Sequence, residues 1–259
     1  MNLILLQPTL RAFDSKGNLE AIELLVAKAK EKISSEDILL LPEHFTFDDD
    51  VNSYDDFIRK LASLANCTVV GGSHHRTMNG KRINYGIAVD RKGNEIGNYS
   101  KLRPYFHELN HVFAGDSFGE FQINGKNFLV LICADFWYSD LMFKTKKQPD
   151  VILVPSLSVS RKPNAGYSQS LWKHTAITRA FEFGAFVGIS DWSENSLLQK
   201  NRTCGVGGFT DPTTIQDDNF FYAISSEGIS MFKLDFDALD EFRSDRKMRG
   251  FFWSANQRK

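Results

Sequence analysis

Short runs of apolar residues, rich in branched side chains, recur along the chain and predict strands that are buried on both faces. The clearest runs are Leu3–Leu6, Ile38–Leu41, Phe128–Ile132, Val151–Val154 and Ala185–Ser190. A strand of this kind needs a covering layer on each side. The pattern therefore indicates a layered body in which helices and sheets alternate.

Residues at helical spacing separate these strands. Apolar residues from Leu19 to Ile33 recur every three or four positions, and we expect Asn18 to cap this first helix. A second helix is predicted over about Tyr54–Ala65. In a third, apolar residues from Leu171 to Phe183 share one side.

Turn signals indicate that hairpins are mixed with the helices. The alternating stretch Asn84–Val89 is followed by a turn and by Glu95–Tyr99 as its antiparallel partner. Asn124–Gly125 is a strong hairpin signal. We also expect Phe220–Ser225 and Ile229–Leu234 to form a last hairpin. Hairpins among alternating helices and strands predict an α/β (α+β layered) fold with mixed sheets.

The chain contains no linker rich in proline, glycine or serine, and no obvious repeat. We therefore expect one domain that covers residues 1–259. The end of the chain after Asp237 is polar, apart from Phe251–Trp253, a candidate docking patch for the body or for a partner chain.

Charge and cysteine content narrow the functional classes. The formal net charge is −1, which predicts no bulk attraction to nucleic acid or anionic lipid. Three cysteines without a paired short spacing (Cys67, Cys133 and Cys204) argue against a disulfide framework and against a zinc knuckle. The apolar start of the chain lacks a basic leader and is too short for a membrane span. A cytoplasmic protein without a membrane partner is expected.

Three chemically distinctive residues each follow a predicted strand: Glu43, Lys101 and Cys133. A cysteine nucleophile reacts as its thiolate, which a neighbouring cation or base favours. A carboxylate can accept the thiol proton and later activate water. A lysine can stabilise the thiolate and an oxyanion beside a backbone N–H. Strand ends can bring such groups together, although a buried cysteine can also serve as a small apolar core residue.

The order of these residues resembles that of the nitrilase superfamily, the carbon–nitrogen hydrolases. The similar motifs are Pro42-Glu43, then Ser100-Lys101-Leu102 with Glu108 and Gly115, then Ile132-Cys133-Ala134-Asp135. Later segments are also similar to this family, so the likeness spans almost the whole chain: Pro149–Ser156, Trp172, Arg179–Glu182, Asp211-Pro212 and Glu227–Ile229.

The resemblance implies a four-layer α-β-β-α sandwich of the nitrilase type, usually dimerised, and a small-molecule amidase activity. It implies Cys133 as nucleophile, Glu43 as general base and Lys101 as electrostatic stabiliser. The oxyanion would lie between Lys101 and the backbone N–H of Ala134. Glu108 matches a second acid that helps to hold the lysine and the substrate. The family needs no cofactor and no metal. We therefore expect a small-molecule amide as the partner, together with a second copy of the chain.

Some positions differ from the family pattern. Ala134 stands where many members carry an aromatic residue, and Phe136–Ser139 replaces an arginine or a Phe-Pro-Glu motif. Phe183 stands where asparagine is common. These differences leave the chemistry in place and leave the substrate open. His44 and Trp137 are further candidates for residues that line the substrate pocket around the proposed reaction centre.

Two alternatives share the chemistry or the fold. Acyl transfer would use the same acyl-enzyme, with an amine in place of water. A non-catalytic member of the family would be retained as a partner protein, which the presence of Glu43, Lys101 and Cys133 together argues against.

A zinc metallopeptidase is the alternative from a different class. His107-Glu108-Leu109-Asn110-His111 is a literal H-E-x-x-H, which can hold zinc when it lies on a helix. Pro104 and Gly115 limit that helix to about three turns, and no clear third ligand follows. A coincidental match is favoured. His74 and His75 are expected at an exposed end of a hairpin.

Overall fold

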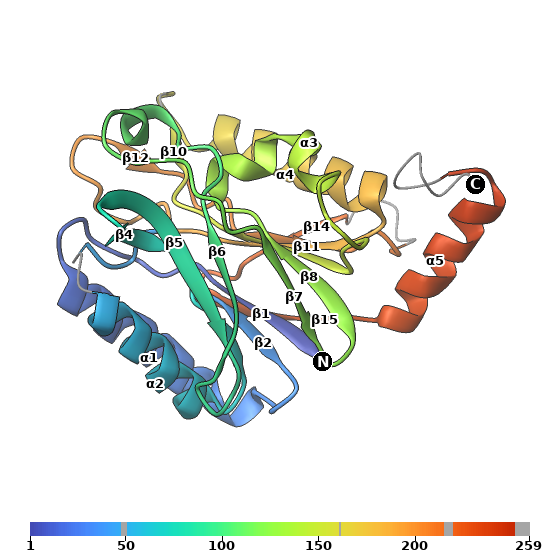
Figure 1. Ribbon diagram of the computed structural model, residues 1–259, viewed down its shortest axis with the longest axis horizontal. Helices are drawn as coiled ribbons and strands as arrows, with labels where there is room; N and C mark the ends of the chain where they lie inside the picture. Colours follow the sequence, from blue (N-terminus) through green and yellow to red (C-terminus); the bar gives the residue numbers. More distant parts are fainter. Residues whose placement is uncertain (48–50, 161, 215–219, 252–259) are drawn as a thin grey trace.

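The structure, a computed structural model, describes residues 1–47, 51–160, 162–214 and 220–251. Two mixed sheets lie face to face, and helices cover their outer faces (Figure 1). Helices α1 (Ser15–Ala29) and α2 (Val51–Ala65) cover one sheet. Helices α3 (Ser139–Met142) and α4 (Gly166–Phe183) cover the other. The predicted four-layer α-β-β-α arrangement is confirmed.

The first sheet has the order β15-β1-β2-β3-β5-β4, and β6 also pairs with β5. Its central strands β1, β2 and β3 are parallel, whereas β15 and β5 run antiparallel to their neighbours. Its strands are β1 (Asn2–Leu6), β2 (Ile38–Leu40), β3 (Thr68–Val70), β4 (His74–Met78), β5 (Lys81–Val89), β6 (Glu95–Ser100) and β15 (Ile229–Lys233).

The second sheet has the order β14-β13-β11-β9-β8-β7, with β8, β9 and β11 parallel. Its strands are β7 (Gly119–Ile123), β8 (Lys126–Val130), β9 (Val151–Pro155), β11 (Phe186–Ser190), β13 (Gly208–Thr210) and β14 (Phe221–Ala223). The hairpin predicted at Asn124–Gly125 is confirmed between β7 and β8, since both turn residues have positive φ. A small separate ladder joins β10 (Val159–Ser160) to β12 (Arg202–Thr203).

The alternation of side chains on β1 explains why both of its faces are apolar. Leu3 and Leu5 belong to the core between the two sheets. Ile4 belongs to the core under α1 and α2. A third core lies between the second sheet and α4. The two sheets approach so closely that a Cβ at Gly188 would lie 2.4 Å from Leu3 Cδ2, which requires glycine there.

Two predictions about local structure were wrong. Asp14, and not Asn18, caps α1, because the Asp14 side chain accepts a hydrogen bond from the backbone N–H of Gly17. Asn18 is buried and anchors the helix, accepting from the N–H of Arg11 and donating to the carbonyl of Phe45. A side chain that fits a cap can equally well serve as a buried anchor.

The predicted last hairpin does not form. β14 pairs with β13 in the second sheet, and β15 pairs with β1 in the first. Both strands were located correctly, but the alternation of apolar and polar residues along a strand does not specify which strand it pairs with. Each strand instead completes the edge of a different sheet.

The polar end of the chain contains a helix that the sequence pattern did not indicate, α5 (Phe236–Met248). Asp235 caps it, and Leu239 is its buried contact. Phe251 is exposed, and the remainder of the expected aromatic patch lies outside the described residues. Among the described residues, no helix is long and apolar enough to cross a membrane.

Candidate active site

The candidate site lies where strands of both sheets end. Glu43 follows β2, Lys101 follows β6, and Cys133 follows β8. Strand β6 is antiparallel to β5, which is antiparallel to β3. β6 therefore ends at the same edge of the first sheet as β2. The structure brings the first two residues into direct contact, with Lys101 Nζ 2.8 Å from Glu43 Oε1.

A buried cluster of charges forms around Lys101. Its ammonium group lies between Glu43 Oε1, at 2.8 Å, and Glu108 Oε2, at 2.7 Å. The amide nitrogen of Asn84 donates to both carboxylates, to Glu43 Oε1 at 2.8 Å and to Glu108 Oε1 at 2.9 Å. All four residues are buried. Buried charges are tolerated when they are paired and hydrogen-bonded in this way.

The pKa values in this cluster follow from its pairing. Burial opposes ionisation of Glu43, but the charge and hydrogen bond of Lys101, together with the neighbouring His44, outweigh it and hold the pKa of Glu43 below its usual value. Burial likewise opposes the charge on Lys101, yet the negative charges around it raise its pKa. The pKa of Glu108 is lowered despite burial, because His44, His75 and Lys101 surround the carboxylate. The cluster is therefore ionised at neutral pH.

Cys133 begins a short 3₁₀ helix, η3 (Cys133–Trp137), in a strained conformation. Its φ is 47°, in the left-handed region that non-glycine residues rarely adopt. The turn leaves the Cys133 side chain on the wall of a cavity. Burial raises the pKa of its thiol well above the usual value, the charge of Glu43 raises it further, and Lys101 only partly offsets this. A protonated thiol therefore faces an ionised carboxylate.

Neighbouring loops fix the positions of these residues. The second oxygen of Glu43 accepts a hydrogen bond from the N–H of Leu157, 3.1 Å away on the loop that follows β9. Trp192 Nε1 donates to the Glu43 carbonyl at 2.7 Å. Both contacts come from the second sheet, so that sheet orients a carboxylate attached to the first.

Asp135 ties the cysteine turn to the lysine turn. Its carboxylate accepts hydrogen bonds from the N–H groups of Leu102 and Arg103, each at 2.9 Å. Burial raises the pKa of Asp135 to about 7. These contacts give Asp135 a structural role as a hydrogen-bond acceptor.

The cavity beside Cys133 has a volume of about 550 Å³. Glu43, His44, Lys101 and Glu108 line it together with Ala134 and Trp137, so all seven residues selected from the sequence meet at one cavity. Trp137 packs edge-on against Trp172, with ring centroids 5.1 Å apart. Six aromatic side chains contribute to its walls: Tyr105, Phe106, Trp137, Tyr138, Tyr167 and Trp172.

The H-E-x-x-H segment does not form the helix that a zinc peptidase requires. It lies on η2 (Phe106–Asn110), a 3₁₀ helix of five residues, with His111 just beyond its end. His107 and His111 are exposed, whereas Glu108 is buried against Lys101. The geometry of this segment therefore gives no support to the metallopeptidase alternative.

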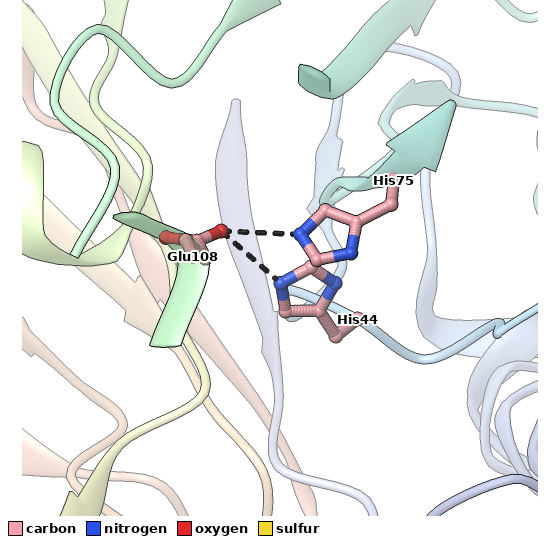
Figure 2. Close-up of side chains that lie close together, drawn as sticks. All are labelled: His44, His75 and Glu108. Atoms are coloured by element: carbon pink, nitrogen blue, oxygen red, sulfur yellow. Dashed lines mark hydrogen bonds and ion pairs between the residues drawn. The ribbon is translucent and has the colours of Figure 1, made fainter. Parts of the chain in front are cut away.

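The expectation for His74 and His75 was wrong. Both lie on β4, and His74 is fully buried and stacks on Tyr54 with ring centroids 4.0 Å apart. His75 Nε2 reaches Glu108 Oε1 at 3.2 Å, and His44 Nε2 lies 3.6 Å from the same oxygen (Figure 2). The two adjacent histidines in the sequence did not indicate that β4 would pair with β5 and so place their side chains on the inner side of the site.

Sequence reasoning also missed Asn84 and Leu157. Asn84 carried a usable signal, because it is a polar residue in the stretch Asn84–Val89, which is otherwise mostly apolar and buried. Leu157 acts through its backbone N–H, and nothing in its side chain could have indicated that role.

A family model for carbon–nitrogen hydrolases matches residues 4–198 of the chain. The chain therefore belongs to the carbon–nitrogen hydrolase family of the nitrilase superfamily, as its motifs predicted. A search of curated proteins found no significant match.

Solved structures with the same fold include nitrilase-superfamily members. Nit3 from Saccharomyces cerevisiae, a member of branch 10 of this superfamily, has a TM-score of 0.78 and 22% identity, over 95% of this chain and 93% of Nit3. An amidase from Nesterenkonia sp. has a TM-score of 0.76 and 19% identity, over 96% of this chain and 95% of the amidase. A variant of that amidase in complex with butyramide has a TM-score of 0.74 and 18% identity, over 97% of each chain. At these identities the likeness establishes the fold.

Proposed function

We propose that this carbon–nitrogen hydrolase is an amidase that acts on small amides through an acyl-enzyme on Cys133. The observation that carries the proposal is the contact of Lys101 with two buried carboxylates on the wall of the cavity that also holds the cysteine. An ionised base, a fixed cation and a protonated thiol are the groups that acyl transfer from an amide needs.

In the first half of the reaction, Glu43 accepts the proton of the Cys133 thiol as the sulfur attacks the amide carbon. The carbonyl oxygen becomes an oxyanion, which Lys101 and the backbone N–H of Ala134 stabilise. The carbon–nitrogen bond then breaks. Ammonia or an amine leaves with the proton that Glu43 holds, and a thioester remains.

In the second half, Glu43 takes a proton from water as the water oxygen attacks the thioester. The carbon–sulfur bond breaks, and the carboxylic acid leaves. Cys133 recovers its proton from Glu43, which restores the resting state. Because burial and Glu43 raise the pKa of the thiol, the thiolate forms only during attack, when the substrate has displaced water.

The cavity favours amides with an apolar acyl group. Aromatic rings form much of its wall, and Leu157, Val159 and Leu171 add aliphatic surface. A volume of about 550 Å³ accommodates more than the smallest aliphatic amides. Structural neighbours that have been studied with acrylamide and butyramide are consistent with a small amide as substrate.

Intact-protein mass spectrometry with a panel of amides tests the proposal. The panel extends from butyramide to amides with phenyl-containing acyl groups, and the mass increase identifies the acyl group bound to the enzyme. We expect an adduct with the wild-type protein and none with Cys133→Ser. Cys204→Ser is the matched control, because Cys204 is a fully buried thiol of the same chain and its loss should leave the adduct unchanged.

Acyl transfer is the second candidate, since the same thioester would form. Adding hydroxylamine during turnover distinguishes the two reactions. A hydrolase forms mainly the carboxylic acid at low concentrations of the amine, whereas an acyltransferase forms mainly the hydroxamate. Failure to detect any adduct across the panel, with folded protein, would contradict both candidates.

We also infer that the chain forms a homodimer. Three exposed apolar side chains on α4 support this, namely Tyr167, Leu171 and Phe181. Sedimentation velocity over a range of protein concentrations measures the oligomeric state, and a monomer at every concentration would contradict the inference.

A further inference from the structure

We propose that His44, His75 and Glu108 form a binding site for a divalent transition-metal cation of the Zn²⁺ type. The three side chains come from separate parts of the chain: the turn after β2, strand β4 and the short helix η2. They meet at Oε1 of Glu108, whereas Lys101 contacts Oε2. Nothing in the hydrolase mechanism uses this arrangement.

The geometry of the ligand atoms suits a small cation. Figure 2 shows both imidazole rings directed at one oxygen of Glu108. Glu108 Oε1 lies 3.2 Å from His75 Nε2 and 3.6 Å from His44 Nε2, and the three ligand atoms all lie within 4.8 Å of one another. Zinc bonds of about 2.0–2.1 Å in a tetrahedron place neighbouring ligand atoms about 3.3–3.4 Å apart. A cation can therefore enter the triangle after small side-chain rotations.

The carboxylate of Glu108 can bind a cation at Oε1 while Oε2 keeps its structural contacts. Its Oε2 atom accepts from Lys101 Nζ at 2.7 Å and from the backbone N–H of Tyr105 at 3.0 Å. Its Oε1 atom faces the histidines and accepts from Asn84 Nδ2 at 2.9 Å. Partners of this kind orient a ligand and increase metal affinity.

The surrounding charges indicate which cations would bind. Glu43 and Glu108 share the positive charge of Lys101, and a second cation, Arg82, lines the adjoining cavity with His75. Net charge therefore gives little attraction to Mg²⁺ or Ca²⁺, which prefer sets of oxygen ligands. Two imidazole nitrogens instead favour Zn²⁺, Ni²⁺ or Cu²⁺.

A second cavity offers a route to the site that does not pass Cys133. It has a volume of about 260 Å³, and His44, His75, Arg82 and His111 are among its lining residues. The substrate cavity meets the same cluster from the other side, where His44 and Glu108 line it. A cation can thus reach the histidines while the substrate cavity is occupied.

Binding of such a cation would inhibit the proposed hydrolase, and this consequence rests on the proposed function. His44 Nε2 lies only 3.6 Å from Glu43 Oε1, so the cation would sit close to the general base. A nearby positive charge lowers the proton affinity of a carboxylate, which weakens Glu43 as an acceptor of the thiol proton.

Isothermal titration calorimetry with Zn²⁺ tests the binding site directly. The protein is Cys133→Ser, stripped with a chelator and desalted, so that the thiol cannot bind zinc and no activity is needed. We expect one high-affinity site, and at least tenfold weaker binding when His75→Gln is added. His44→Asn should have the same effect, because asparagine tolerates the positive φ of 56° at this position. Mg²⁺ should give no comparable binding.

His107→Gln is the matched control, since it changes an exposed histidine next to Glu108 and should leave zinc affinity unchanged. Loss of binding in His107→Gln but not in His75→Gln would assign the zinc to the H-E-x-x-H segment and overturn the proposal. Absence of stoichiometric binding to the parent protein would also overturn it. Circular dichroism of each variant establishes that it is folded. If His75→Gln does not fold, the zinc affinity of His44→Asn is the deciding measurement.

Inhibition is measured separately on the enzyme with Cys133 intact. Zn²⁺ should slow turnover reversibly, and His75→Gln should raise the inhibition constant at least tenfold. Zinc binding without amidase turnover would leave the metal site intact and refute the proposed function. Equal inhibition of both proteins would place the inhibitory zinc at Cys133.

Discussion

The two sheets contribute different parts of the candidate site. The end of the first sheet supplies buried, ionised groups that are already paired with one another, Glu43 and Lys101. The end of the second sheet supplies Cys133, which is neutral and strained, and the backbone N–H of Leu157. The second sheet orients Glu43, but the ion pair of Glu43 with Lys101 does not involve the thiol, so substitutions on the two sides should have different consequences.

The largest effect is expected from removing the proposed nucleophile. Cys133→Ala should reduce turnover by roughly 10⁴-fold or more, since loss of a nucleophile removes the covalent route. The charge cluster of the first sheet does not depend on the thiol, so the melting temperature should stay within a few degrees of the wild type. Steady-state kinetics and thermal denaturation measure the two quantities. Turnover close to the wild type would exclude Cys133 as the nucleophile.

Substitutions on the charged side should affect both rate and stability. Lys101→Ala removes the proposed oxyanion donor, and loss of such a donor typically costs roughly 10²–10³ in rate. It also leaves Glu43 and Glu108 buried without their cation, and breaking a buried pair costs about 3–5 kcal/mol of stability. Single-turnover kinetics and urea denaturation test both effects. A stable, active Lys101→Ala protein would remove the lysine from the site.

Glu43→Gln keeps the shape of the side chain but cannot accept the thiol proton. It should therefore slow acylation to about the same extent as Lys101→Ala. The losses in Glu43→Gln and Lys101→Ala should not add in the double mutant, because in the proposed mechanism the two residues act with Cys133 as one unit. Single-turnover rates of the single and double mutants measure this. Full additivity would show that they act independently.

A smaller effect is expected at Asn84, which links the two carboxylates. Asn84→Leu keeps the branching and the number of side-chain heavy atoms and removes the hydrogen bonds to Glu43 and Glu108. Donation to a carboxylate stabilises its charged form, so the loss should raise the pKa of Glu43 and slow turnover about tenfold. The acidic limb of the pH profile of kcat/KM should move to higher pH. An unchanged limb would mean that Asn84 only fills space.

The sequence predicted the layers of the fold well, because strands buried on both faces produce continuous apolar runs. It failed where partners lie far away along the chain. The strand Phe220–Ser225 was recognised, but its place beside β13 depends on which sheet edge is free. The helix α5 was missed because only Leu239 is buried among many polar residues.

In the candidate site, too, the sequence predicted local motifs but not the contacts between segments that lie far apart in the chain. The motifs around Glu43, Lys101 and Cys133 could be read directly, because each has a distinctive residue after a strand. The sequence did not reveal that burial would leave the thiol protonated, since this depends on the distance to Glu43 and on desolvation. Nor could it reveal that His75 turns inward to Glu108.

A last prediction compares two buried carboxylates, Glu43 and Asp191, at the ends of the two sheets. The charge of Lys101 keeps the pKa of Glu43 low against the effect of burial. Asp191 accepts from the N–H groups of Ser158 and Val206, both at 2.8 Å, but burial dominates and raises its pKa to about 7 from 3.8. The folded protein therefore holds a proton on Asp191 between about pH 4 and pH 7, whereas the unfolded chain has released it.

This group's contribution to stability is complete below about pH 4 and is lost as the pH rises through 7. Asp191→Asn cannot ionise, so the free energy of unfolding should fall less over this range than in the wild type, by up to about 4 kcal/mol. Turnover should change least of all the variants, because Asp191 holds the backbone of Ser158 and Val206 and does not itself line the cavity beside Cys133. Urea denaturation from pH 4.5 to 7.5 measures the slope, with the exposed Asp116→Asn as control. Parallel curves for Asp191→Asn and the wild type would show that Asp191 is ionised in the fold, as Glu43 is.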